Sequence, residues 1–210
     1  MRARLLRGAA FLVLGLALLS AAFAQAAKTD ALKLYLDGKS EEARVATLAE
    51  IAADPQNIEA YVVLCWSLLD LERWADAENY ALKAYAIRRD PRVVEILGEA
   101  SFMLGRNEAS LRYFQSYVAA LPEGTRVGVA YYHMGELYLR QARFSHADIA
   151  LTAALQFAPS NARWWARLGW AREKANDTQG ALRAYGEALR LDPRLEDALL
   201  GKERVAARAR

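Results

Sequence analysis

The sequence predicts an all-α protein, on the evidence of a helix-favouring composition, apolar residues at helical spacing and an internal repeat. Proline and glycine, which interrupt helices, number only 5 and 12 in 210 residues. The frequent residues Ala, Leu, Arg and Glu lose little rotamer freedom in a helix. With 54% hydrophobic and 25% charged residues the chain can bury a substantial core, which argues against disorder over most of its length.

Residues 1–26 have the organisation of a secretory signal peptide. Three arginines within the first seven residues precede an apolar run over residues 9–19, and residues 22–26 carry small side chains at alternate positions. We therefore expect cleavage near residues 24–26 and a periplasmic or otherwise exported protein. The alternative is a membrane anchor formed by the uncleaved segment, although its apolar stretch is short for a span of ~20 residues.

The formal net charge of +3 comes from that segment, because the chain without its three arginines has 25 basic and 25 acidic residues. A nearly neutral chain lacks the excess of Lys and Arg that neutralises phosphates, so we expect no nucleic-acid partner. The single cysteine, Cys65, cannot form an intramolecular disulfide, and we expect it to be buried and unreactive. Cations at the C-terminal end suit the end of a last helix. They are Lys202, Arg204, Arg208 and Arg210.

An internal repeat with a period of 34 residues organises the chain. Its clearest members are Gly135, Ala147, Ala154 and Pro159, which recur as Gly169, Ala181, Ala188 and Pro193. The pattern predicts helical hairpins, because small residues let two helices approach closely, large residues fill the buried faces and proline ends the second helix. We expect Gly135 and Gly169 to meet Ala147 and Ala181 where the two helices of a hairpin cross.

This pattern closely resembles the tetratricopeptide repeat. The unit at residues 162–194 carries the characteristic residues Trp165, Leu168, Gly169, Ala181, Tyr185, Ala188 and Pro193. The unit at residues 128–161 carries Tyr131, Met134, Gly135, Tyr138, Ala147, Leu151, Ala154 and Pro159. The resemblance implies a right-handed superhelical solenoid of helix-turn-helix hairpins.

Weaker copies extend the repeat over nearly all of the chain that follows the signal segment. Residues 58–90 form one unit, and residues 91–127 form a degenerate unit with a longer loop. In the degenerate unit the bulky Tyr117 replaces a small residue, so we expect the helix crossing to change there. Residues 28–57 are expected to be a partial N-terminal repeat, and residues 195–210 a capping helix.

The chain lacks the residue patterns of an enzyme or a cofactor site. Neither His133 nor His146 belongs to a recognised metal or nucleophile motif, and no phosphate-binding glycine loop is present. Ser145, His146 and Asp148 cannot form a triad on one helix, and Ser145 and Asp148 instead have the spacing of a capping box. His133 and Glu136 could share a helix face, but two ligands do not make a metal site. We expect no catalytic residue, no metal and no cofactor.

The resemblance places a partner-binding groove along the first helix of each hairpin. The residues expected to line it are Trp66, Leu69, Glu95, Glu99, Phe102, Tyr132, Glu136, Arg140, Arg163, Arg167 and Trp170. They provide aromatic steps, a carboxylate-rich middle and a basic C-terminal end. An extended or helical peptide is the expected ligand, because aromatic side chains anchor a partner and charges set its direction.

Other roles for these residues stay open. Trp66 and Trp170 could pack between adjacent first helices, and we expect Trp164 to contact the preceding repeat. Some tetratricopeptide domains clamp a C-terminal carboxylate with basic and amide side chains. Here Glu95 and Glu99 stand at matching positions and would repel a carboxylate, which disfavours that mode.

The sequence therefore predicts an exported interaction module, an adaptor or scaffold that binds a protein or peptide partner of unspecified identity. The partner could belong to an envelope complex or be a second copy of the chain. The alternative is an accessory ligand-binding subunit of an envelope transporter, with an apolar pocket made by Trp66, Phe102 and Tyr132.

Overall fold

The computed structural model describes residues 30–208, and all regular structure in that range is helical, as predicted. The helices are α2 (Ala31–Leu36), α3 (Ser40–Ala53), α4 (Ile58–Asp70), α5 (Trp74–Ile87), α6 (Pro91–Met103), α7 (Asn107–Ala120), α8 (Val127–Arg140), α9 (Phe144–Phe157), α10 (Ala162–Lys174), α11 (Thr178–Leu191) and α12 (Glu196–Arg208). Among these helices none is both long and apolar enough to cross a membrane. The predicted signal peptide lies outside the described residues.

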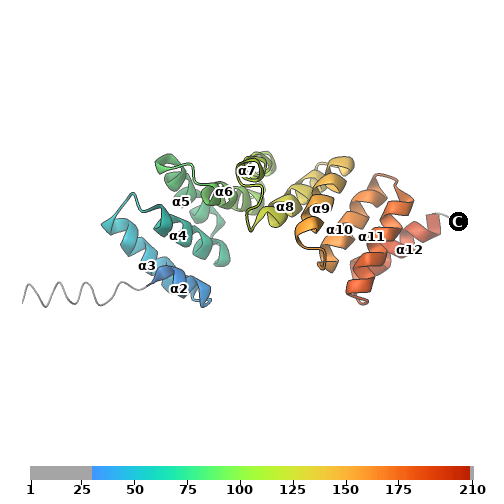
Figure 1. Ribbon diagram of the computed structural model, residues 1–210, viewed down its shortest axis with the longest axis horizontal. Coiled ribbons are helices and arrows are strands. Elements are labelled where there is room, and N and C mark those ends of the chain that lie inside the picture. Colours follow the sequence, from blue (N-terminus) through green and yellow to red (C-terminus); the bar gives the residue numbers. More distant parts are fainter. Residues whose placement is uncertain (1–29, 209–210) are drawn as a thin grey trace, which may run out of the picture.

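Successive helices pack as hairpins that stack in chain order (Figure 1). The pairs are α2 with α3, α4 with α5, α6 with α7, α8 with α9 and α10 with α11. Each second helix also packs against the first helix of the next hairpin, so every hairpin buries apolar surface on its neighbour. The chain runs as an elongated solenoid from α2 at the left of Figure 1 to α12 at the right, which confirms the predicted fold class.

The two helices of a hairpin come closest where a glycine of the first helix meets a large side chain of the second. A Cβ atom on Gly135 would lie 2.6 Å from Leu151 Cγ, and one on Gly169 would lie 2.7 Å from Tyr185 Cδ1. Real Cβ atoms do not approach other atoms this closely, so only glycine fits without repacking. These contacts explain why the two repeats share glycine here.

The alanines expected at these contacts, Ala147 and Ala181, are fully buried, and the atoms nearest to a Cβ added to each glycine belong to Leu151 and Tyr185. The alanines lie one helical turn before these two residues. Helical side chains lean toward the N-terminus, so a large residue covers the surface over the turn that precedes it.

At the matching positions of two other hairpins the two sites are in contact, since Cys65 Sγ lies 3.6 Å from the Ala77 carbonyl oxygen and the Ser110 hydroxyl donates to the Gly98 carbonyl oxygen at 2.8 Å. The contact of Gly135 and Gly169 with Ala147 and Ala181 stays a prediction.

The turn inside each hairpin holds one residue in the left-handed backbone conformation. Glycine takes this position in two of the turns, as Gly38 with φ 75° and Gly105 with φ 73°. Glu72, Ala142 and Asn176 take it in the others, with φ between 55° and 63°. A residue with a Cβ atom is strained in this region, so the turn geometry is imposed by the packing of the two helices.

The longer loop between α7 and α8 accommodates Tyr117, the bulky residue in the degenerate unit. Tyr117 is buried, and a Cβ atom on Gly124 of this loop would lie 2.6 Å from its hydroxyl oxygen. The loop therefore passes directly over the tyrosine, and only glycine allows that approach. The extra residues cover a side chain that is too large for a standard repeat contact.

The last helix, α12, packs on both α10 and α11 and closes the C-terminal end of the core. A Cβ atom on Gly201 would lie 2.2 Å from Tyr185 Cζ, so α12 lies against the tyrosine ring. The Tyr185 hydroxyl donates to Glu173 Oε2 at 2.9 Å, and Arg204 Nη2 donates to the same oxygen at 3.0 Å. One hydrogen-bonded group thus links α10, α11 and α12.

Cys65 behaves as predicted. It is fully buried on α4, and its thiol lies 3.6 Å from the carbonyl oxygen of Ala77 on α5. Burial raises the pKa of the thiol to about 12, so it stays protonated and unreactive at neutral pH.

Candidate interaction surface

The first helices of the hairpins form a continuous row along the solenoid. Helix α2 packs against α4, α4 against α6, α6 against α8 and α10 against α12. Between α8 and α10, the rings of Tyr132 and Trp164 stack at 4.9 Å and Arg167 pairs with Glu136. We call the outward side of this row the first-helix face. It is defined by Trp66, Glu99, Phe102, Tyr132, Glu136, Arg140, Arg163, Trp164, Arg167 and Trp170, none of which is fully buried.

Aromatic rings connect neighbouring first helices on this face. Tyr35 of α2 stacks on Trp66 of α4 with ring centroids 5.7 Å apart. Tyr132 of α8 and Trp164 of α10 are nearly parallel in their stack, with an interplanar angle of 8°. Trp164 therefore contacts the preceding repeat, as predicted. Partly exposed stacked rings give a rigid, apolar surface that loses little entropy when a partner binds.

Cations lie over two other rings of the face. The Arg140 guanidinium lies 4.0 Å from the centroid of Phe102, and the Lys174 amine lies 4.4 Å from that of Trp170. The guanidinium carbon of Arg204, on α12, lies 5.3 Å from the centroid of Trp170. These contacts hold the long side chains against the rings and keep their charged ends at the surface.

Ion pairs from first helices to the next unit of the chain recur at nearly the repeat spacing. Each joins a glutamate to an arginine 31 or 33 residues later. The four pairs are Glu59 with Arg92, Glu95 with Arg126, Glu136 with Arg167 and Glu173 with Arg204. Since each pair spans two successive hairpins, the series fixes how one repeat is set against the next.

Arg126, in the loop before α8, holds two carboxylates of α6. Its Nε donates to Glu95 at 2.6 Å and its Nη2 donates to Glu99 at 2.5 Å. Glu95 is 2% exposed, and burial raises its pKa to about 7, against the attraction of Arg126. The expected carboxylate-rich middle is thus largely neutralised within the molecule. Sequence reasoning missed Arg126 because it lies in the loop that departs from the repeat.

Two of the predicted groove residues are not available to a partner. Leu69 is 8% exposed and belongs to the N-terminal core, while Glu95 is buried beneath Arg126. Both lie on first helices, but each turns toward neighbouring repeats, where burial and pairing favour it. The remaining predicted residues are exposed or partly exposed on the first-helix face.

The structure offers no catalytic arrangement among the candidate polar residues. Helix α9 begins at Phe144 and has no side-chain cap, so the predicted capping box at Ser145 is wrong. Asp148 instead accepts hydrogen bonds from Arg172 and Thr152, and His146 is exposed. Asp148 thus pairs with Arg172 of the next repeat and does not cap its own helix.

His133 and Glu136 do not combine as metal ligands. Glu136 accepts two hydrogen bonds from Arg167, whereas His133 lies among Phe102, Phe114 and Tyr132. Its Nδ1 is buried without a hydrogen-bond partner in the described part of the chain. Burial lowers the pKa of His133 to about 4, so the ring is neutral at pH 7. Within residues 30–208, no three metal-binding side chains gather.

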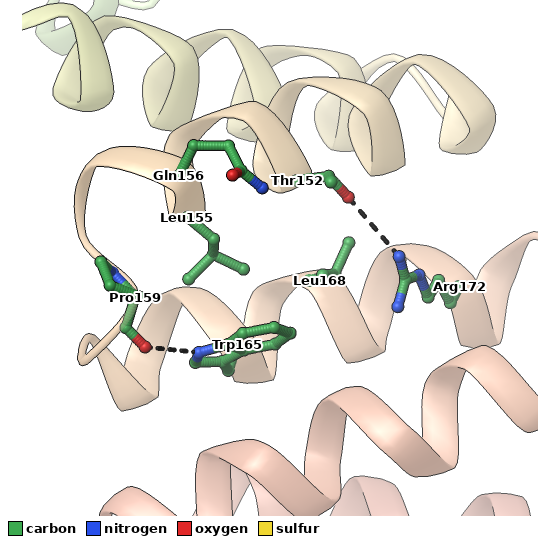
Figure 2. Close-up of a pocket in the computed structure, with 7 residues that line it drawn as sticks. All are labelled: Thr152, Leu155, Gln156, Pro159, Trp165, Leu168 and Arg172. Atoms are coloured by element: carbon green, nitrogen blue, oxygen red, sulfur yellow. Dashed lines mark hydrogen bonds between the residues drawn. The ribbon is translucent and has the colours of Figure 1, made fainter.

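A separate pocket of about 370 Å³ lies between α9 and α10 (Figure 2). Leu155, Leu168 and Trp165 form its apolar wall, and the Trp165 indole N–H donates to the Pro159 carbonyl at 2.8 Å. Its charged residue, Arg172, already pairs with Asp148. The pocket therefore offers apolar surface but few polar groups that could select a ligand.

Comparison with known proteins identifies the repeats. Residues 129–161 and residues 162–195 each match a family model described as the tetratricopeptide repeat. No curated protein sequence matches the chain. Tetratricopeptide repeats therefore form the α8–α9 and α10–α11 hairpins.

Several solved structures share the fold. The protein named MamA is 24% identical, with a TM-score of 0.68 over 78% of this chain and 95% of its own. Pseudomonas aeruginosa PilF is 17% identical, with a TM-score of 0.74 over 88% of this chain and 83% of its own. YrrB, described as a tetratricopeptide-repeat protein with an unusual peptide-binding site, is 19% identical, with a TM-score of 0.69 over 82% and 88%. At these identities the likeness establishes the solenoid fold alone.

Proposed function

We propose that this chain is an exported protein-interaction module that binds a peptide segment of a protein partner along the first-helix face. The observation that carries the proposal is the combination of partly exposed aromatic rings with arginine and lysine side chains on adjacent first helices. Aromatic and arginine side chains are the residues that contribute most to binding at protein interfaces.

The shape of the surface supports a peptide rather than a compact small molecule. The rings and charges are distributed from α4 to α10, over several repeats, instead of converging on one cavity. A linear segment can contact such a row through successive side chains, as groove-binding peptides do. YrrB shares this fold and is described as having a peptide-binding site, which makes the proposal reasonable by analogy.

The transporter-subunit alternative loses its supporting pocket. It required Trp66, Phe102 and Tyr132 to surround one apolar ligand. Trp66 packs with the N-terminal core cluster, whereas Phe102 and Tyr132 pack with the central one. Stacking on Tyr35 and Trp164 further occupies the rings of Trp66 and Tyr132.

Replacement of Trp170 tests the binding proposal. Trp170→Ala should weaken partner binding more than tenfold, because a buried aromatic anchor typically contributes ~2 kcal/mol or more. Trp74→Ala is the control, since Trp74 is also partly buried but lies on the second helix α5. The measurement is recovery of partners from envelope extracts by each full-length protein, followed by titration of the recovered partner. Equal losses in both variants would refute the assignment of the face.

Export is tested separately. N-terminal sequencing of the protein from fractionated cells should find a chain that begins close to residue 25 or 27, in the exported fraction. A chain that begins at Met1 in the cytosol would refute export without bearing on the binding face. Light scattering of the same sample would show whether a second copy is the partner.

A further inference from the structure

The chain's own ion pairs leave an uneven balance of charge on the first-helix face. The glutamates that this face presents from α6 to α10 are each held by an arginine of the chain. Arg140, Arg163 and Lys174 are exposed, and they are absent from the ion pairs formed within residues 30–208. The charges left for a partner between α8 and α10 are therefore positive. The sequence predicted the basic C-terminal end of the face, but not that the carboxylates in its middle would be paired within the chain.

Arg140, Arg163 and Lys174 lie on α8 and α10, the two helices that carry the stacked pair of Tyr132 and Trp164. Burial and Glu136 raise the pKa of Tyr132, while Arg167, Arg163 and Arg140 oppose that rise. Three guanidinium groups thus act on the Tyr132 hydroxyl, against one carboxylate. Only Arg167 of the three is committed to Glu136. The site has an apolar centre, the stacked rings, and a cationic rim.

We propose that the partner segment is acidic and carries an aromatic or large apolar side chain next to its carboxylates. This proposal rests on the proposed function, since it specifies the ligand of the same face. The apolar side chain packs against Tyr132 and Trp164. The carboxylates lie beside Arg140 and Arg163, where charge-assisted hydrogen bonds to guanidinium groups are strongest.

The charges at the ends of the face limit the acidic stretch. Asp70, at the end of α4, accepts a hydrogen bond from Ser40 but forms no ion pair with an arginine or lysine in the described part of the chain. Asp197 of α12 lines a shallow pocket with Arg167 and Trp170. A long polyanion would meet these carboxylates at both ends, whereas a short acidic segment fits between them. This argument favours a peptide over a single-stranded nucleic acid, which aromatic rings and cations can also bind.

The test selects peptides on the full-length protein, purified from the cells that produce it naturally. A displayed library of random 12-residue peptides is selected on three proteins. They are the wild type, Arg140→Glu/Arg163→Glu, and the control Arg112→Glu/Arg183→Glu, whose arginines are exposed on the second helices α7 and α11. Enriched peptides are then titrated at low and high salt, beside a 12-nucleotide single-stranded oligonucleotide.

We expect the wild type and the control to enrich acidic peptides that contain Trp, Phe or Leu. The face variant should bind those peptides about tenfold or more weakly, with a smaller salt dependence. Enriched peptides that are neutral or basic, and that need Trp170, would overturn this inference but leave the proposed function standing. No enrichment by any of the proteins would overturn both. Oligonucleotide binding as tight as peptide binding, and equally sensitive to the face variant, would replace the acidic peptide with a nucleic acid.

Discussion

Gly169 has little room for a side chain, because the ring of Tyr185 occupies the space where it would be. Gly169→Leu should therefore destabilise the protein by about 3 kcal/mol, since overpacking forces the helices apart. Gly186→Ala is the control: this glycine lies in α11 with no atom within 4 Å of an added Cβ, so alanine should stabilise by about 0.5–1 kcal/mol. Thermal unfolding of both variants measures the two effects. Equal midpoints would contradict the packing at Gly169.

His133 makes stability depend on pH in a defined direction. Its pKa is about 4 in the folded chain and about 6.5 when unfolded, so between these values the unfolded chain binds the proton and the folded chain does not. Stability is therefore lost as the pH falls from 6.5 toward 4. His133→Phe removes the proton site and keeps an aromatic ring among Phe102 and Phe114.

Urea unfolding at pH 7 and pH 4.5 tests this prediction. The wild type should lose about 2 kcal/mol more stability between the two pH values than His133→Phe does. Parallel losses in the two proteins would mean that the imidazole is accessible to protons in the folded state.

The turns that join the two helices of a hairpin contain backbone strain that the sequence did not predict. Ala142 adopts φ 55° between α8 and α9, where the matching position in the α6–α7 turn is Gly105 with φ 73°. Ala142→Gly should stabilise the protein by up to about 1 kcal/mol, because glycine adopts this conformation without a steric cost. Gly105→Ala should have the opposite effect by a similar amount, since no atom lies within 4 Å of the added Cβ. Denaturant midpoints of the two variants should move in opposite directions, and movement in the same direction would contradict this account of the turns.

The ion pairs between first helices are the element-scale feature with the clearest functional consequence. Arg167 is 34% exposed and Glu136 14% exposed, with two hydrogen bonds between them. A pair held this way is committed to joining repeats, and its charges are largely cancelled for a partner. Side chains that form no ion pair within the described residues, such as Arg163, are the ones left for recognition of a partner.

At the scale of the whole molecule, the fold could be predicted because each repeat carries its own packing signal. Gly135 and Gly169, with the large residues that cover them, specify the hairpin locally, and the period of 34 residues specifies stacking.

For the candidate surface, the sequence predicted which helices form the face but not which of its charges are paired. The pairing of Glu95 and Glu99 with Arg126 was not predicted because Arg126 lies in the loop outside the repeat alignment, although Glu95 and Arg126 are 31 residues apart, as are Glu136 and Arg167. Charge counting along the sequence therefore missed that the carboxylates in the middle of the face are paired with arginines of the same chain.

Site-specific crosslinking tests the central claim, that a protein partner binds the first-helix face. A photoreactive phenylalanine analogue is placed at Tyr132, where an aromatic ring preserves the stack on Trp164, and at Tyr113 on the second helix α7 as a control. Irradiation of living cells should crosslink a partner protein from position 132 and not from position 113, and Trp170→Ala should reduce the yield several-fold. A partner captured equally from both positions, or only from position 113, would place the working surface elsewhere on the solenoid and contradict the account.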